Sequence, residues 1–316
     1  SYNHYFGWYG GKMEDNGPWL DNFHAKHPNI SLGVSEYGCE GIITYHGPNP
    51  KCKDYSEDYQ ALYHEHMAKV LDERPWIWSS HVWNMFDFGC AARDEGGVAG
   101  RNNKGLVTMD RATKKDSYYI YKAYWNPTPM VHLCGKRYAQ RAGDVREIKV
   151  YTNQESVELF LNGESLGKKT IADSDGYRAC WMIPFQPGEL KAVVDGAENV
   201  LVTSGAAASI QLHSDVSTLV SDGLSIAQVE VTLLDAKGYV AAAVDEQVFY
   251  QVLGDAEILG IENGAPDDLT PYAEHHRMTN NGKALVYLRA GRMAGPITLH
   301  AYTRTGLSAD CMIAQG

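Results

Sequence analysis

Glu36 ends a mainly apolar run, residues 30–38, that is typical of a buried β-strand. A second strand-like run, residues 76–88, carries Trp83. At the carboxyl ends of neighbouring parallel strands such a pair can serve a sugar-cleaving site, because a carboxylate can attack an anomeric carbon and an indole can pack against the C–H groups of the ring. The two residues therefore predict carbohydrate chemistry at the mouth of a (β/α) barrel.

Both residues also have a purely structural interpretation. Glu36 could be a salt-bridged glutamate at a strand end, and its position alone favours neither role. Trp83 could be a core aromatic, which is the commoner role of tryptophan in a buried strand. The polar loop of residues 93–105 is either solvated or, if it covers a barrel mouth, in contact with hydroxyl or carboxylate groups of a substrate.

Residues 1–129 alternate between strand and helix patterns, which implies a parallel sheet. We expect strands at residues 2–9, 30–38 and 76–88, and helices near residues 18–25, 56–73 and 115–125. The middle helix has the clearest signal, because its apolar residues are spaced by three and four and its first turn is acidic, which suits the helix dipole.

The pattern changes after residue 129 to short runs with period-two alternation, which predicts β-sheet. Asn162-Gly163 follows such a run and is the strongest short signal for a hairpin turn. We expect one β-sandwich over residues 130–205 and a second over residues 206–316, with a linker near residues 203–209. The fold class is therefore α/β plus all-β.

The composition limits the classes of partner. At 316 residues the chain has room for two or three domains, and its net charge of −11 argues against a nucleic-acid partner. No apolar stretch reaches the roughly 20 residues of a membrane span. The six cysteines form no C-x-x-C pair or zinc-type spacing, so we expect unpaired thiols, no metal site and, on balance, a cytoplasmic protein.

Several ordered motifs give these features a family context. They are Asn3–Tyr9, Ser35–Gly38, Trp83–Phe88, Asn102–Arg111 and Lys114–Tyr119. In this order and spacing, residues 2–125 resemble the second half of the catalytic barrel of glycoside hydrolase family 2, the β-galactosidase and β-glucuronidase group. Residues 130–316 resemble the immunoglobulin-like domains that follow the barrel in many bacterial β-galactosidases. The resemblance implies the last strands of a (β/α)8 TIM barrel, residues 1–129, followed by two immunoglobulin-like β-sandwiches.

The resemblance also implies roles for single residues. Glu36 would be the nucleophile of a retaining exo-β-glycosidase, with Tyr5 bonded to it. Trp83 would line the subsite of the cleaved sugar, with Asn3 and Tyr9 close by. The family's acid/base glutamate lies in an Asn-Glu pair, and no such pair occurs in residues 1–129. We therefore expect a C-terminal portion of a longer enzyme that is inactive by itself, with no cofactor.

The substrate is less constrained. Asn102 and Lys104 have the Asn-x-Lys spacing with which β-glucuronidases grip the sugar carboxylate, whereas the insertion at residues 93–97 and the trailing sandwiches favour a β-galactosidase. We expect a terminal β-galactoside, with a glucuronide as the alternative. A carbohydrate-binding or adhesion role for the sandwiches is the non-enzymatic alternative, and ligand-free spacers are the simplest one. A second copy of the chain is a further partner that we consider, in a homo-oligomer.

Overall fold

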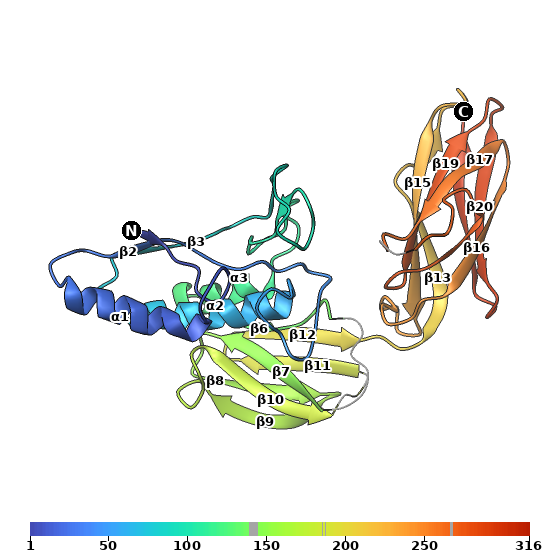
Figure 1. Cartoon of the computed structure of the whole chain (residues 1–316). Coiled ribbons are helices and arrows are strands. Elements are labelled where there is room, and N and C mark those ends of the chain that lie inside the picture. Colours follow the sequence, from blue (N-terminus) through green and yellow to red (C-terminus); the bar gives the residue numbers. More distant parts are fainter. Residues whose placement is uncertain (139–144, 185, 187, 266–267) are drawn as a thin grey trace. The chain divides into compact units, whose positions relative to one another are not determined.

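The computed structural model describes residues 1–138, 145–184, 186, 188–265 and 268–316. Its contacts group into two compact units (Figure 1). The first contains residues 1–138 and the strands up to residue 201, and the second contains residues 202–316. The domain bounds 1–129, 130–205 and 206–316 stay a prediction.

The first unit opens with a parallel sheet, as the alternating pattern predicted. Strands β1 (Tyr2–Asn3), β2 (Gly33–Tyr37) and β3 (Ser79–Val82) pair in that order. The short 3-10 helix η1 (Met13–Asp15) and helix α1 (Asn16–Lys26) connect β1 to β2, and helix α2 (Glu57–Asp72) connects β2 to β3. Helix α3 (Asp116–Trp125) follows, so the three predicted helices are confirmed.

Two predicted strands are wrong in extent. The strand expected over residues 2–9 ends at Asn3, because the chain turns at Gly7, where φ is +90° and a Cβ would meet Met13 at 2.8 Å. The strand expected over residues 76–88 ends at Val82, and Trp78 is 65% exposed. Beyond it, the Asn84 side chain accepts a 2.7 Å bond from the Phe86 amide, which forms a local turn.

Short pairs and buried polar groups organise the loops beyond this sheet. Strands β4 (Phe88–Gly89) and β5 (Arg101–Asn102) pair with each other. The buried Lys115 ammonium donates to the carbonyl oxygens of Gly41 and Asn103, at 2.7 and 3.1 Å, and to Asp87 Oδ1 at 2.8 Å. A buried ammonium must satisfy its donors, so these bonds hold three separate loops together.

Two antiparallel sheets complete the first unit, with orders β10-β7-β6 and β12-β11-β8-β9 around one apolar core. The strands are β6 (Val131–Leu133), β7 (Val145–Thr152), β8 (Ser156–Leu161), β9 (Glu164–Thr170), β10 (Arg178–Pro184), β11 (Gly188–Val194) and β12 (Ala197–Thr203). Asn162 and Gly163 join β8 to β9 with φ values of 52° and 86°, which confirms the predicted hairpin.

A buried carboxylate joins helix α2 to these sheets. Glu65 accepts a 2.7 Å bond from Lys149 Nζ, and it also accepts bonds from the Tyr151 hydroxyl and from Arg178. Tyr151 belongs to the apolar core that the helices share. Residues 130–201 therefore brace the α/β part directly.

The second unit consists of two sheets with one shared core. One sheet contains β13 (Ala207–Ser214), β15 (Ile226–Asp235), β19 (Lys283–Ala290) and β17 (Ala256–Glu262). The other contains β14 (Thr218–Leu219), β21 (Ser308–Gln315), β20 (Gly295–Thr303), β16 (Gln247–Leu253) and β18 (His276–Met278). The period-two strands are confirmed, but the linker expected at residues 203–209 is shorter, since β12 ends at Thr203 and β13 begins at Ala207.

Two further predictions about composition can be compared with the described residues. All six cysteines have free thiols, as expected. Among the described helices, none combines the length and apolar character that crossing a membrane requires.

The Lys115 cross-link can be tested by Lys115→Met. Removing one partner of a buried pair leaves Asp87 uncompensated, so we expect the free energy of unfolding to fall by about 3–5 kcal/mol. All seven tryptophans lie at or before Trp181, so tryptophan fluorescence during urea unfolding reports on the first unit. The control is Lys114→Met at the exposed neighbouring lysine, and an equal loss there would contradict the assignment.

Candidate active site

Glu36 lies at the carboxyl end of β2, beside the end of β1. Asn3 and Glu36 are parallel neighbours, and the His4 amide donates to the Glu36 carbonyl oxygen at 2.7 Å. The Tyr5 hydroxyl donates to Glu36 Oε2 at 2.7 Å. Burial and this hydrogen bond raise the pKa of Tyr5, so the phenol keeps its proton and remains a donor.

The partner of the Glu36 carboxylate matters for its chemistry. Among the residues that the structure describes, its side-chain partner is a neutral hydroxyl and no cation pairs with it. The described residues therefore do not support the interpretation of Glu36 as a salt-bridged glutamate. A hydroxyl orients a carboxylate without neutralising it, and Glu36 is only half-buried, so the carboxylate stays available to a ligand.

Trp83 follows β3 at the same edge of the sheet. Its amide donates to the Tyr37 carbonyl oxygen at 2.8 Å, and its half-buried ring meets Phe88 edge-on at 6.0 Å between centroids. The close approach needs a glycine at position 38, where a Cβ would stand 2.2 Å from the Trp83 carbonyl oxygen. Glu36 and Trp83 thus lie at adjacent strand ends, as their spacing predicted.

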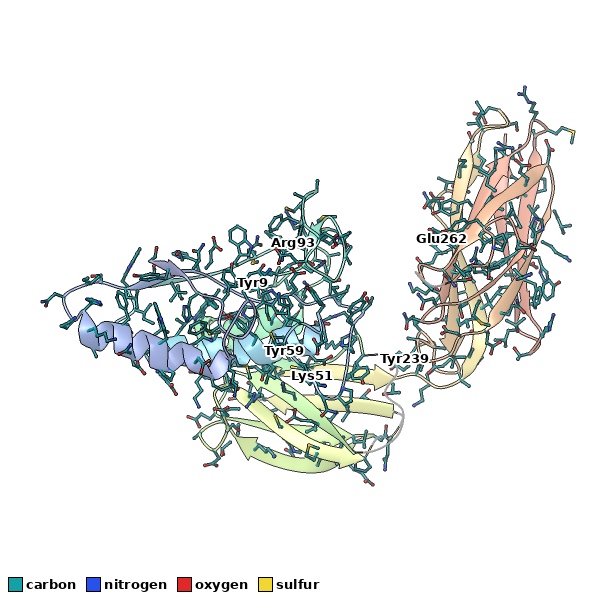
Figure 2. All side chains as sticks on the ribbon, viewed as in Figure 1. Tyr9, Lys51, Tyr59, Arg93, Tyr239 and Glu262 are labelled. Atoms are coloured by element: carbon teal, nitrogen blue, oxygen red, sulfur yellow. The ribbon has the colours of Figure 1, made fainter. Side chains whose placement is uncertain are left out.

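Tyr9 and Lys104 belong to a separate charged group, which we call the Glu40 cluster (Tyr9, Glu40, Arg93, Glu95 and Lys104). Figure 2 labels two of its members, Tyr9 and Arg93. Lys104 Nζ lies 2.9 Å from the Tyr9 hydroxyl and 3.3 Å from Glu40 Oε1. Arg93 Nε donates to the same Glu40 oxygen at 3.0 Å. Glu40 is fully buried and Lys104 is 1% exposed, so this ion pair is internal. The Asn-x-Lys spacing predicted a lysine that is available to a substrate, whereas Glu40 already partly compensates the charge of Lys104.

The two candidate asparagines have different roles in the structure. Asn3 is exposed, and its Oδ1 accepts a 2.9 Å bond from Ser35 Oγ beside Glu36. Asn102 is buried, and its Oδ1 accepts a 3.0 Å bond from the Lys104 amide. That bond shapes the loop that carries Lys104, so Asn102 positions the lysine through the backbone.

Sequence reasoning missed Glu40 and did not single out Glu95. The sequence carried one signal for Glu40, which is an acidic residue soon after the apolar run of β2. A carboxylate that is buried at such a position requires cationic partners, and these could have been sought among the lysines and arginines of the loops. Glu95 was included only as part of a polar loop. Its carboxylate is bonded to Tyr9 and Arg93, at 2.8 and 3.0 Å.

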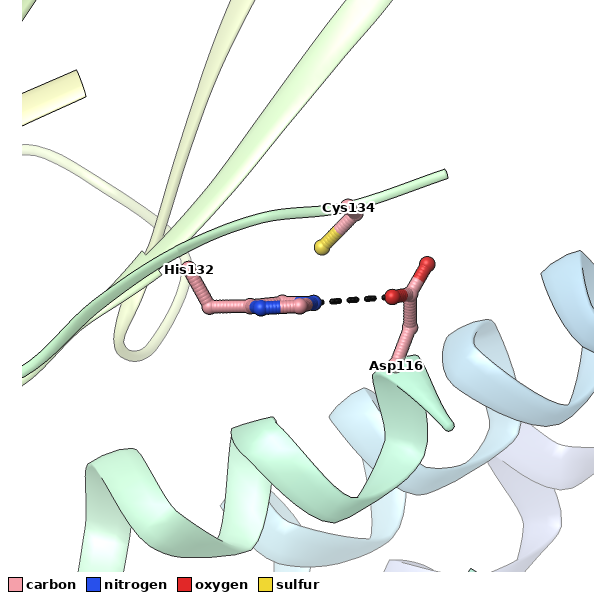
Figure 3. Close-up of side chains that lie close together, drawn as sticks. All are labelled: Asp116, His132 and Cys134. Carbon is pink, nitrogen blue, oxygen red and sulfur yellow. Dashed lines mark hydrogen bonds and ion pairs between the residues drawn. The ribbon is translucent and has the colours of Figure 1, made fainter. Parts of the chain in front are cut away.

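One group of side chains has the composition of a metal site (Figure 3). Ligand atoms of Asp116, His132 and Cys134 all lie within 4.8 Å of one another. The Asp116 carboxylate is already used, by His132 Nε2 at 2.8 Å and by the Gly135 amide at 2.6 Å, and Arg137 Nη2 lies 3.5 Å away. Burial raises the pKa of the Cys134 thiol, which disfavours a thiolate ligand. The group is better explained as a link between α3 and β6.

Two family models match the sequence. Residues 210–311 match "Glycoside hydrolase family 2 C-terminal domain 5", and residues 143–199 match a domain of unknown function, DUF4982. Both matches lie outside the α/β part that carries Glu36.

Curated relatives extend the comparison. The chain is 42% identical over 176 residues to a β-glucuronidase of Bacteroides fragilis, which covers 54% of this chain and 25% of the relative. It is 31% identical over 250 residues to β-galactosidase BoGH2A of Bacteroides ovatus, covering 77% of this chain and 29% of the relative. The chain thus spans between a quarter and a third of these relatives.

Solved structures agree with these matches. An FMN-binding β-glucuronidase from Facaelibacterium prausnitzii L2-6 is 60% identical, with a TM-score of 0.61, over 63% of this chain and 31% of that chain. A glycosyl hydrolase family 2 member from Bacteroides cellulosilyticus is 23% identical, with a TM-score of 0.56, over 94% of this chain and 40% of that chain, and supports the fold alone. The chain belongs to glycoside hydrolase family 2, and it corresponds to the C-terminal part of the family's enzymes.

Proposed function

We propose that this chain is the C-terminal part of a retaining exo-β-glycosidase, in which Glu36 is the nucleophile. In this proposal residues 1–129 are the last strands of a (β/α)8 barrel, and two immunoglobulin-like sandwiches follow. The observation that carries the proposal is the Glu36 carboxylate at a parallel-strand end, oriented by the Tyr5 hydroxyl and adjacent to the strand end of Trp83. Parallel barrels place their chemistry at this end of the strands.

The geometry suits a double displacement. Glu36 attacks the anomeric carbon while a general acid protonates the departing oxygen, which gives a covalent glycosyl ester. Water, deprotonated by the same acid/base group, then cleaves the ester and restores Glu36. Retaining enzymes need their two carboxyl groups about 5–5.5 Å apart, so the acid/base group must be held rigidly. We propose that the longer protein supplies it, and that residues 1–316 alone are nearly inactive.

The charge around Tyr9 favours a glucuronide over the galactoside that the sequence features favoured. Lys104 and Arg93 both contact the Tyr9 hydroxyl, at 2.9 and 3.2 Å, and Tyr9 is 51% exposed. Cationic donors at this hydroxyl suit a sugar carboxylate that replaces Glu95, which accepts a bond from the same hydroxyl. Several of the relatives are named β-glucuronidases, which supports the same substrate class. A galactoside remains the second candidate, since one relative is named a β-galactosidase.

The name of the 60% identical relative also motivates a proposal about a cofactor. A cleft of about 370 Å³ lies between helices α1 and α2 and strand β10, and its lining includes Met13, Leu62 and Val70. Lys69 and Arg178 supply cations in the same cleft, but Glu14, Glu65, Glu73 and Asp175 also line it, and Arg178 pairs with two of these carboxylates, Glu65 and Asp175. Apolar walls and nearby cations are the features that a flavin ring and a phosphate need. Because Lys69 already pairs with Asp175, a phosphate would compete with that carboxylate.

The role of Glu36 is tested by Glu36→Gln in the longer enzyme. Removing the nucleophile should lower kcat by about 10³-fold or more, with the fold retained. A 2-fluoro glycoside that traps the ester should label Glu36, as read by peptide mass spectrometry. Labelling of another residue would refute the assignment.

The substrate class is tested by Lys104→Met in the longer enzyme. Loss of a charge-assisted hydrogen bond should lower kcat/KM on p-nitrophenyl glucuronide by about 10- to 100-fold and leave the galactoside rate nearly unchanged. Both substrates are assayed on the same preparation, so a folding defect lowers both rates together. A selective loss on the galactoside would support the galactosidase instead.

Flavin binding is tested by titrating FMN and following its fluorescence. The chain should quench the flavin with a saturable curve at one equivalent. Lys69→Gln should weaken binding by about tenfold, whereas Lys26→Gln, at the exposed end of α1, should not. Absence of saturable quenching would exclude the cofactor.

A further inference from the structure

The Glu40 cluster holds two carboxylates in very different surroundings. The Glu40 side chain is fully buried and bonded to Arg93 and Lys104. The Glu95 side chain is 44% exposed and belongs to a loop. Glu40 is thus part of the interior, whereas Glu95 contacts only one of the same two cations, Arg93, from an exposed loop.

Glu95 receives the contacts that a bound carboxylate would receive. One of its oxygens accepts a 2.8 Å bond from the Tyr9 hydroxyl and a 3.0 Å bond from Arg93 Nη2. Two ammonium groups, those of Lys53 and Lys104, lie 4.5 and 4.9 Å from the centre of the Tyr9 ring. A hydroxyl, a guanidinium and nearby ammoniums form a complete set of donors and charges for an anion.

The charges require a second carboxylate. Arg93, Lys104 and Lys53 face a single buried carboxylate, Glu40, so the cluster without Glu95 has an excess of positive charge. Burial has the largest single effect on the pKa of Glu95, and it opposes ionisation. However, the Tyr9 hydrogen bond and the charges of the three cations lower its pKa overall. Glu95 is therefore ionised at neutral pH and compensates the excess.

The loop can release this carboxylate. Gly96 and Gly97 follow Glu95 with φ values of +104° and +67°, a region that favours glycine. Residues 94–99 are all exposed. The Glu95 backbone is held by a bond from the Tyr55 hydroxyl to its carbonyl oxygen, so the side chain can rotate away while the loop keeps one anchor.

We propose that Glu95 is an internal ligand for the donors Tyr9 and Arg93 beside Lys104, and that an anionic sugar must displace its carboxylate. This inference rests on the proposed glycosidase function and adds a specificity-determining residue to it. Glu95 makes uronides compete with a tethered carboxylate, whereas a neutral sugar meets no such competitor. The Glu95 carboxylate, when it is bound to Tyr9 and Arg93, therefore weakens the binding of anionic sugars selectively.

The test is Glu95→Gln, which removes the charge and keeps the shape of the side chain. The probe is D-glucuronate, whose binding to the 316-residue chain is measured by titration calorimetry. We expect Kd to fall by about tenfold in the variant. The matched control is Asp94→Asn, which removes the same charge from the exposed neighbouring position and should change Kd by less than about twofold.

Each outcome decides the proposal. An unchanged Kd for Glu95→Gln, an equal gain for Asp94→Asn, or no glucuronate binding by any variant would overturn it. D-Galactose serves as the neutral probe and should bind equally to all three proteins. Because binding is read without turnover, failure here leaves the Glu36 labelling experiment unaffected, and failure of labelling leaves the carboxylate site measurable.

Discussion

The buried ammonium of Lys115 is the constraint on which the rest of the site depends. An ammonium out of water is costly unless each donor is satisfied, and here the partners come from three separate segments, through Gly41, Asp87 and Asn103. Glu40 precedes Gly41 and Lys104 follows Asn103 in the chain. The same cross-link therefore places both members of the Glu40–Lys104 pair, although neither touches Lys115.

Two glutamates four positions apart show how surroundings separate chemical roles. Glu36 is half-buried and bonded to a neutral hydroxyl, so its charge remains available for an electrophile. Glu40 is fully buried between a guanidinium and an ammonium, so these two cations compensate its charge. A strand alternates its side chains between two faces, but position alone does not distinguish these glutamates; the partners that surround each one do.

The sequence predicted the features that local patterns determine. The spacing of apolar residues in α2 and the Asn162-Gly163 turn depend on neighbours within a few positions, and both are confirmed. The strand expected up to Phe88 was wrong in extent, because an apolar run does not specify where the chain turns. The Glu40–Lys104 pair joins residues 64 positions apart, and no periodic pattern encodes such a contact.

The difference between local patterns and long-range contacts changes the interpretation of the Asn-x-Lys spacing. The spacing suggests an unpaired lysine that can bind a sugar carboxylate, but Lys104 already forms an ion pair with Glu40. A substrate carboxylate that binds here must rely on the additional positive charge of Arg93. In the structure, Glu95 already pairs with that charge. Two chains with an identical Asn-x-Lys motif can therefore differ in substrate class, because selectivity follows from the sum of charges around Tyr9 rather than from one lysine.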